Sequence, residues 1–351
     1  MKTFLHTKSP LRIFAISGLV TIVTLLAVAL GMGLAALYVV LILMIVEITF
    51  SFDNAIINAK ILERLNPFWQ KMFLTVGIFI AIFGMRVLFP VLIVSLTAHL
   101  GWAQVVDLAL HHPDLYGHHL EAAHPMISAF GGAFLLMLAF QFFFDDERDV
   151  LWIKKLESKM QLLSHWAWAP AVTSIAMGFV SLVPMNHHAR QTVIAGALGT
   201  LTYVAIQLLV RWMDHLHPAK KYGSSTAVQT GLAAFLTFVY LEILDASFSF
   251  DGVIGAFAIT SDIVLIGAGL GVGAIWVRSL TVYIFRKKTL SHLIYLEHGA
   301  HYTVFVLAIV MLASVLLRIP EFVPGLTGMG IIGASVVASV RASRLQGQHD
   351  K

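Results

Sequence analysis

The sequence contains no cysteine among its 351 residues, which excludes disulfide bonds, thiolate metal sites and cysteine nucleophiles. Charged residues are also scarce, because Asp, Glu, Lys and Arg together make up 12% of the chain, about half their usual share in a soluble domain. No long polar stretch interrupts the sequence, so no soluble domain is expected. Hydrophobic residues make up 58% of the chain and recur in long runs. Such runs predict one α-helical membrane domain over residues 1–351.

About ten of these runs are as long as a bilayer-spanning helix, which needs roughly 20 residues. We therefore expect an all-α fold, a polytopic transmembrane helical bundle. The predicted spans are 13–31, 34–58, 72–97, 126–144, 167–185, 190–210, 227–257, 262–285, 302–317 and 322–340.

Lysine and arginine gather on one side of the predicted membrane. Most of the 23 basic residues lie at the two termini and in the loops that follow even-numbered spans. Because cytoplasmic segments collect Lys and Arg, both termini are predicted to be cytoplasmic. The formal net charge of +4 then reflects orientation in the bilayer, and no nucleic-acid partner is expected.

A short acidic phrase occurs twice inside the apolar runs. Glu47 and Asp53 enclose it late in the second span as "EITFSFDN", and Asp245 and Asp251 enclose it late in the seventh as "DASFSFDG". The second and seventh spans cross in opposite directions, and the span after each carries one arginine. The pattern predicts an inverted-topology repeat of spans 2–4 and 7–9. Its two arginines are Arg86 and Arg278, and its segments are 34–144 and 227–317, with connecting helices over 145–226.

The spacing of the acids predicts a break in both helices. Residues six apart on an ideal helix point about 120° away from each other, so Glu47 and Asp53 could not face one ion on a straight helix. Weak helix formers near both motifs favour local unwinding, which is tolerated where the backbone lines a cavity. Glu242 lies three residues before Asp245 on the same face, and we expect it to join or orient the second site. The weak helix formers are Ser51, Asn54, Ser249 and Gly252.

The free-energy cost of placing these charged side chains inside the bilayer favours a functional role. A helix-end position that reaches water would explain Asp53 but not the deeper Glu47. Five acids and two arginines would together cost roughly 20 kcal/mol if they were unpaired at the bilayer centre. The excess negative charge and the hard oxygen ligands suit Mn²⁺, Ca²⁺ or Mg²⁺. Arg86 and Arg278 either neutralise the acids or gate the ion, and both interpretations stay open.

Both acidic phrases resemble the TerC family of the LysE/TerC superfamily, as "EITFSFDNAI" and as "DASFSFDGVIGAFAITSD" with the following "WVRSLTVY". Two further segments, "FFFDDERDVLW" and "YLEHGAHY", resemble a TerC-like branch of integral membrane proteins. The resemblance covers roughly residues 34–317. It implies a bacterial cytoplasmic (inner) membrane protein that exports a metal ion, with Mn²⁺ first, and an association with tellurite resistance. No tightly bound cofactor is implied. By motif match, the ion-binding positions would be Glu47, Asp53, Asn54, Asp245 and Asp251.

Histidines gather in the predicted outer loop between the third and fourth spans. They suit either a metal-binding lip or a solvated loop with chance histidines. The segment "EHGAH" (297–301) likewise suits either a metal site or a helix-end network. The acids of 142–152 are expected to be solvated partners of Lys154 and Lys155. The lip histidines would be His111, His112, His118, His119 and His124.

The leading interpretation of the whole sequence is a secondary transporter of divalent cations, not an enzyme. Protonation of a carboxylate could drive ion release. Two alternatives come from other classes: a membrane-embedded hydrolase with a metal-activated water, and a non-transporting membrane partner in tellurite-type stress resistance. Ion flux into proteoliposomes discriminates among them, because only the transporter moves ions.

Overall fold

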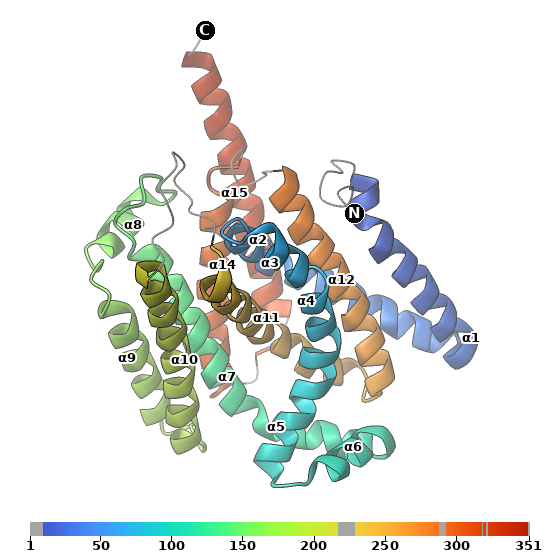
Figure 1. The fold of residues 1–351 in the computed structure, drawn as a ribbon. Helices are drawn as coiled ribbons and strands as arrows, with labels where there is room; N and C mark the ends of the chain where they lie inside the picture. The colour runs from blue at the N-terminus through green and yellow to red at the C-terminus, as the bar shows by residue number, and fades with distance from the viewer. Residues whose placement is uncertain (1–9, 217–228, 288–292, 318, 321, 350–351) are drawn as a thin grey trace. The chain divides into compact units, whose positions relative to one another are not determined.

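The computed structural model describes residues 10–216, 229–287, 293–317, 319–320 and 322–349 (Figure 1). Helices make up nearly all of these ranges, and no strand occurs within them. The chain forms two compact units. Unit 1 comprises residues 1–124 and 238–287, and unit 2 comprises residues 125–237 and 288–351.

Unit 1 contains the first six α-helices, one π-helix and α12. Two longer helices, α7 (Pro113–Phe143) and α11 (Gly231–Ile259), each continue from one unit into the other. The other elements are α1 (Pro10–Phe50), α2 (Phe52–Leu62), α3 (Pro67–Phe73), α4 (Val76–Phe79), the π-helix η1 (Ile80–Leu88), α5 (Phe89–Ala98), α6 (Trp102–His111) and α12 (Ile263–Lys287).

In the part of unit 2 that the structure describes, most of α7 is followed by five further helices. These are α8 (Lys154–Gln161), α9 (Trp168–Leu182), α10 (Ala189–Leu216), α14 (Leu296–Ser314) and α15 (Phe322–His349).

Eight helices of the described ranges are long and apolar enough to cross a membrane. The prediction of an all-α, multi-pass membrane bundle is thereby confirmed. The count is eight rather than ten for two reasons. The predicted spans 13–31 and 34–58 are counted once, because the run Ile13–Phe50 holds two helices that meet at Gly33, and the end of the second span lies in α2. The helix α9 has only 15 residues.

The join inside α1 is a kink at Gly33, and Figure 1 shows the sharp bend near the middle of this helix. Gly33 has φ 88° and ψ 179°, a conformation that only glycine adopts readily. The sequence boundary predicted near residue 33 is therefore a bend between two helical halves rather than a loop.

The third predicted span is built from several short pieces. Asn66 caps α3 by accepting a hydrogen bond from the backbone N–H of Trp69 at 3.0 Å, and Pro67 occupies the first turn, where its missing N–H costs nothing. The π-helix η1 follows, and α5 ends at His99 in the left-handed region with φ 55°. The run Pro67–Ala98 is thus apolar enough to cross a membrane without being one regular helix.

The prediction of a broken helix at each acidic phrase is right for the first phrase and wrong for the second. The helix does change at Ser51, which separates α1 from α2 with φ −98° and ψ 19°. At the second motif, however, α11 runs without interruption past Ser249 and Gly252. Weak helix propensity is overridden there because a long helix gains more from packing than it loses at two positions. The predicted outer loop is also largely helical, as α6 and the start of α7.

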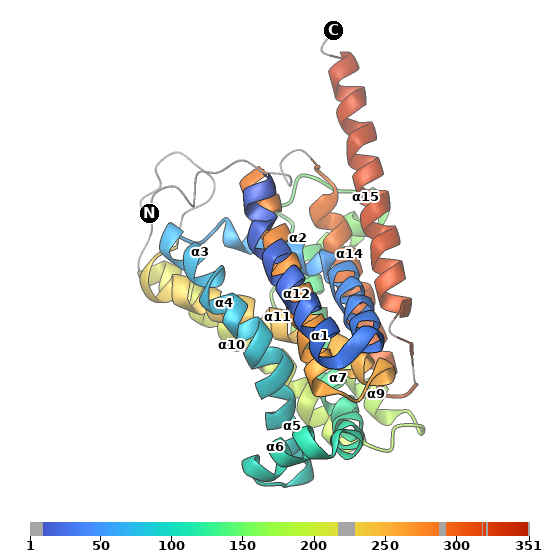
Figure 2. The same ribbon diagram turned by 90° about the vertical axis from the view of Figure 1, so that its right-hand side faces the viewer.

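Inside unit 1, α12 packs along α1, and Figure 2 shows the two helices side by side. Ser17 and Ser279 hydroxyls lie 2.6 Å apart, and Trp276 donates a hydrogen bond to Thr21 at 2.9 Å. Gly269 allows the closest approach, since a Cβ atom there would lie 2.5 Å from the Cβ of Leu43. This packing brings the second half of α1, which ends in the first acidic phrase, against the helix that carries Arg278.

Candidate ion-binding site

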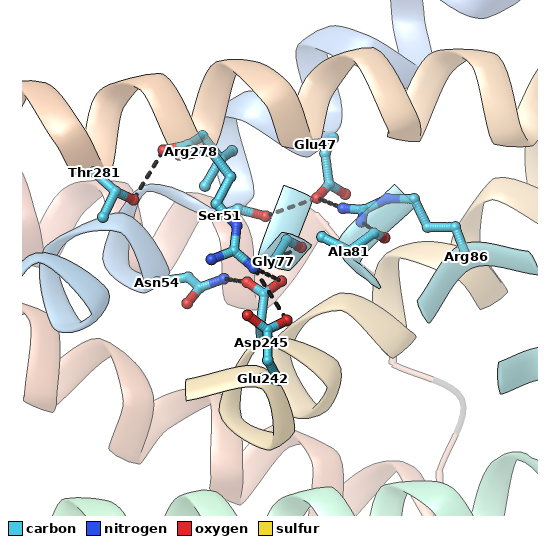
Figure 3. Close-up of polar contacts among 11 residues, drawn as sticks. Glu47, Ser51, Asn54, Gly77, Ala81, Arg86, Glu242, Asp245, Arg278 and Thr281 are labelled. Atoms are coloured by element: carbon cyan, nitrogen blue, oxygen red, sulfur yellow. Dashed lines mark hydrogen bonds and ion pairs between the residues drawn. The ribbon is translucent and has the colours of Figure 1, made fainter. Parts of the chain in front are cut away.

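The first acid–arginine pair joins α1 to η1. Glu47 lies in the last turn of α1 and Arg86 lies near the end of η1; both are buried, and the Arg86 guanidinium forms an ion pair with the Glu47 carboxylate (Figure 3). Ser51 donates a further hydrogen bond to the same Glu47 oxygen at 3.3 Å. The first predicted carboxylate and the first predicted arginine therefore lie together.

The π-helix sets the position of Arg86. Such helices are rare and frequently occur at functional sites. The wider turn places the Arg86 guanidinium 2.5 Å from the carbonyl oxygen of Ala81, to which it also donates a hydrogen bond. The sequence of η1 includes Gly84 and several β-branched residues, which are weak helix formers, but nothing in it distinguishes a π-helix from an α-helix.

The second acid–arginine pair joins α11 to α12. Arg278 Nη2 lies 3.0 Å from Asp245 Oδ2 and 3.5 Å from Glu242 Oε2. It also donates a hydrogen bond to the carbonyl oxygen of Gly77 at 3.4 Å, and its guanidinium lies 3.7 Å from the centre of the Phe73 ring. All three charged side chains are buried. Glu242 thus joins the second site, as the sequence predicted.

The two halves of the site touch each other directly. Asn54 Nδ2 donates a hydrogen bond to Asp245 Oδ1 at 2.7 Å, across 191 residues of sequence (Figure 3). Gly77, on α4, lies against Glu242, because a Cβ atom at this position would be 2.6 Å from Glu242 Oε1. A contribution from each predicted repeat is therefore present at one place inside unit 1.

Asp53 differs from the other acids in its surroundings. Its side chain is buried and accepts a hydrogen bond from the backbone N–H of Asn54 at 2.9 Å. Among the residues that the structure describes, no basic side chain pairs with it. The matching acid of the second phrase, Asp251, has a side chain that lies outside the described part of the structure.

The histidines of the predicted outer lip lie on α6, on α7 and between them. His111 Nδ1 lies 2.8 Å from Asp107 Oδ1, one turn away on α6, and both side chains are exposed. In the described ranges, no group of three His, Asp or Glu side chains is placed to hold a metal ion. This holds for the acids of unit 1 as well. The metal-binding lip with His112, His118, His119 and His124 and the metal role of the acids both stay predictions.

Unit 2 contains a buried polar network that the sequence interpretation missed in part. The acids of 142–152 are exposed, as predicted for solvated side chains. Glu157, on the polar helix α8, is by contrast fully buried. It accepts a hydrogen bond from the Tyr302 hydroxyl at 3.1 Å and lies 3.5 Å from Arg148 Nη1. His298 Nε2 lies 2.8 Å from the carbonyl oxygen of Val150. The segment "EHGAH" thus belongs to a helix-end network, one of its two predicted roles.

Burial lowers the pKa of the Arg148 guanidinium, and the carboxylates of Glu157 and Asp145 oppose this shift. The guanidinium also lies over the Phe142 ring, 3.9 Å from its centre. The network fastens the segment after α7 to the first turns of α14. Glu157 therefore has a structural role in this network, and the candidate ion site is the one in unit 1.

Comparison with known proteins relates the chain to one family. Residues 52–346 match the family described as "Protein of unknown function (DUF475)". No curated protein and no solved structure matches the chain. The matched region includes Asp53, Asn54, both arginines and the whole second acidic phrase. Because the match extends over most of its 351 residues, this multi-pass membrane protein belongs to the DUF475 family.

Proposed function

We propose that this membrane protein transports a divalent metal cation, with Mn²⁺ as the first candidate, and that it does so in the direction of export. The observation that carries the proposal is the pair of buried acid–arginine contacts in unit 1, Glu47 with Arg86 and Asp245 with Arg278. A hydrogen bond from Asn54, in the first acidic phrase, to Asp245 links that phrase to the second pair. The resemblance of both acidic phrases to the TerC family supports the choice of metal.

The charges of this site favour a cation. The described residues of unit 1 include four of the predicted carboxylates and both guanidinium groups, which leaves an excess of two negative charges when all are ionised. Asp53 is the acid without a basic partner among the described residues. Carboxylate and amide oxygens are hard ligands of the kind that Mn²⁺, Ca²⁺ and Mg²⁺ prefer. A buried excess of negative charge is costly unless a cation compensates it.

The arginines suggest how binding is coupled to movement. In the absence of an ion, each guanidinium holds a carboxylate of its own repeat, which keeps that acid from remaining buried and unpaired. An entering divalent cation competes for the same carboxylates and releases the arginine. Each carboxylate would thus exchange an arginine for the cation. Because half of the site belongs to each inverted repeat, this exchange would open the site to one side of the membrane and then to the other. Protonation of a released carboxylate would add proton coupling.

Ion flux tests the proposal. Purified protein in proteoliposomes should move Mn²⁺ down a concentration gradient, and Asp53→Asn should reduce the rate by about tenfold or more, equivalent to about 1.4 kcal/mol. The substitution keeps the size of the side chain and removes the charge that offsets ion dehydration. Asp107→Asn is the matched control, because it removes an exposed acid from α6, outside the site.

Two outcomes would overturn the proposal. Wild-type protein that moves none of the three cations would exclude this transport function. Equal loss of flux in Asp53→Asn and Asp107→Asn would exclude the assigned site.

The direction of transport is tested in membrane vesicles. Uptake of the ion into inverted vesicles, rather than into right-side-out vesicles, would establish export as the direction.

A further inference from the structure

Two polar stripes run along the helices that carry the site. The spacing i, i+3, i+7 places their members on one face of each helix. The first stripe begins at the boundary of α1 and α2 and continues along α2; its members are Ser51, Asn54 and Asn58. The second stripe lies on α11; its members are Glu242, Asp245 and Ser249.

The stripes meet at their middle members. Asn54 Nδ2 donates its hydrogen bond to Asp245 Oδ1 at 2.7 Å, so the polar face of α2 is turned toward the polar face of α11 at this point (Figure 3). The contact uses the amide nitrogen of Asn54 and leaves the amide oxygen available.

Both stripes contain buried oxygen atoms that have no hydrogen-bond partner. They are Asn54 Oδ1, Asn58 Oδ1, Glu242 Oε1 and Ser249 Oγ. Asn58 is the most pronounced case, because the residue is 0% exposed and neither atom of its amide has a partner. A buried polar group without a partner costs free energy, and in native proteins it usually serves a ligand or an ordered water.

Asn58 lies one helical turn beyond Asn54 on the same face of α2, about 6 Å along the helix axis. The acid–arginine pairs do not require it, since Glu47 and Asp245 find their partners without it. Its position continues the site along α2, and Ser249 continues it along α11 on the other side of the Asn54–Asp245 contact. The two helices run in opposite directions here, because Gly252 lies against Glu47 as Asp245 lies against Asn54. Neutral oxygens at these places would bind a cation without trapping it, because each lacks a formal charge.

We propose that Asn58 and Ser249 are further cation ligands, one on each side of the Asn54–Asp245 contact, which bind a hard, partly hydrated divalent cation as it passes between α2 and α11. The inference rests on the proposed transport function and deepens it by assigning two neutral positions to the ion path. The amide nitrogen of Asn58 would donate a hydrogen bond to a water molecule that the ion retains.

The test compares polar groups that are equally buried. Asn58→Leu preserves the approximate size of the side chain and removes both polar atoms, and Ser249→Ala removes one hydroxyl. Thr173→Val is the matched control, because Thr173 is also fully buried, its hydroxyl has no partner, and it lies on α9 in unit 2. The dissociation constant of Mn²⁺ is measured by electron paramagnetic resonance on the full-length protein in detergent, and KM by flux in proteoliposomes.

Asn58→Leu should raise the dissociation constant and KM by about tenfold, with unchanged thermal stability, because an apolar group of similar shape replaces an unpaired amide. Ser249→Ala should raise both by a smaller factor, and Thr173→Val should change neither. If Asn58→Leu lowers the amount of folded protein, Ser249→Ala decides the question with its smaller change.

The possible failures are distinguishable. Wild-type affinity and KM in folded Asn58→Leu and Ser249→Ala would overturn the inference and leave the proposed transport intact. A wild-type protein that binds Mn²⁺, loses affinity in these variants and moves no ion would overturn the transport function and leave the binding site. Wild-type protein that binds no Mn²⁺ would overturn both.

Discussion

At the scale of single residues, the two arginines pair with different numbers of acids. Arg86 pairs with one carboxylate, that of Glu47. Arg278 uses Nη2 for Asp245, for Glu242 and for the carbonyl oxygen of Gly77, while its Nη1 has no hydrogen-bond partner. One guanidinium cannot neutralise two acids, so the second pair keeps a residual negative charge. A cation should therefore compete more easily at Arg278 than at Arg86.

The first prediction concerns Arg278→Lys. Lysine keeps the charge but lacks the planar fork that contacts several acceptors at once, so it should hold Asp245 and Glu242 less firmly. The entering ion would then meet less competition, and KM for Mn²⁺ flux should fall severalfold while the protein remains folded. The variant Arg64→Lys, at an exposed position after α2, should behave as wild type. An unchanged or higher KM in Arg278→Lys would contradict the competition between arginine and ion.

At the scale of the helical elements, the packing of α12 against α1 determines whether the site can form. Gly269 and Gly267 lie two residues apart on α12 but in different surroundings. A Cβ atom at Gly269 would lie 2.5 Å from the Leu43 Cβ and 3.2 Å from the Val40 carbonyl oxygen, whereas one at Gly267 would meet nothing within 4 Å. A side chain at Gly269 would thus meet atoms of α1, including backbone, whereas there is room for one at Gly267.

The second prediction compares alanine at these two positions. Gly269→Ala should lower the stability of the protein by about 1–3 kcal/mol, because overpacking forces the helices apart. Gly267→Ala should be neutral or raise stability by up to about 1 kcal/mol, because alanine is the better helix former. Thermal unfolding in detergent measures both. A larger loss in Gly267→Ala than in Gly269→Ala would contradict the described contact of α12 with α1.

The third prediction concerns the helix α8 of unit 2. Glu157→Gln keeps the shape of the side chain but removes the charge that faces Arg148, and should lower stability by about 1–3 kcal/mol. Glu147→Gln, an exposed acid on the preceding segment, should have no measurable effect. Thermal unfolding compares the two variants, and equal stability would show that the buried network does not fasten this segment.

At the scale of the whole molecule, the orientation in the membrane follows from the distribution of Lys and Arg and stays a prediction. The absence of native cysteine makes it simple to test, because any introduced cysteine is the only thiol in the chain. His118 on α7 and Ser164 after α8 are both exposed and lie on opposite predicted sides.

The fourth prediction is the labelling pattern of these two positions. A membrane-impermeant maleimide should modify His118→Cys in intact cells and should modify Ser164→Cys only after permeabilisation, because the basic segments are predicted to face the cytoplasm. Labelling of Ser164→Cys alone in intact cells would reverse the predicted topology. Labelling of both would contradict the placement of these segments on opposite sides of a membrane.

Some of the discrepancies between sequence and structure have a common cause. The weak helix formers Ser249 and Gly252 predicted a break, yet α11 continues past them. The π-helix at Ile80–Leu88 had no signal at all. Glu157, on the polar helix α8, is fully buried although nothing in the sequence singled it out. In each case, contacts between elements decided the outcome against the local preference of the residues.

The sequence by itself determined that this protein is an all-α, multi-pass membrane protein, because hydrophobic length is a local property that can be read directly. It also singled out the duplicated acidic phrase and its two arginines, because charges are rare and costly in apolar runs. Only the tertiary structure decided which charge pairs with which, and that Asn54 meets Asp245 across 191 residues. Such pairing depends on which side chains the packing of the helices brings within about 3 Å of each other. The spacing of residues along one helix does not tell which face of another helix they will meet.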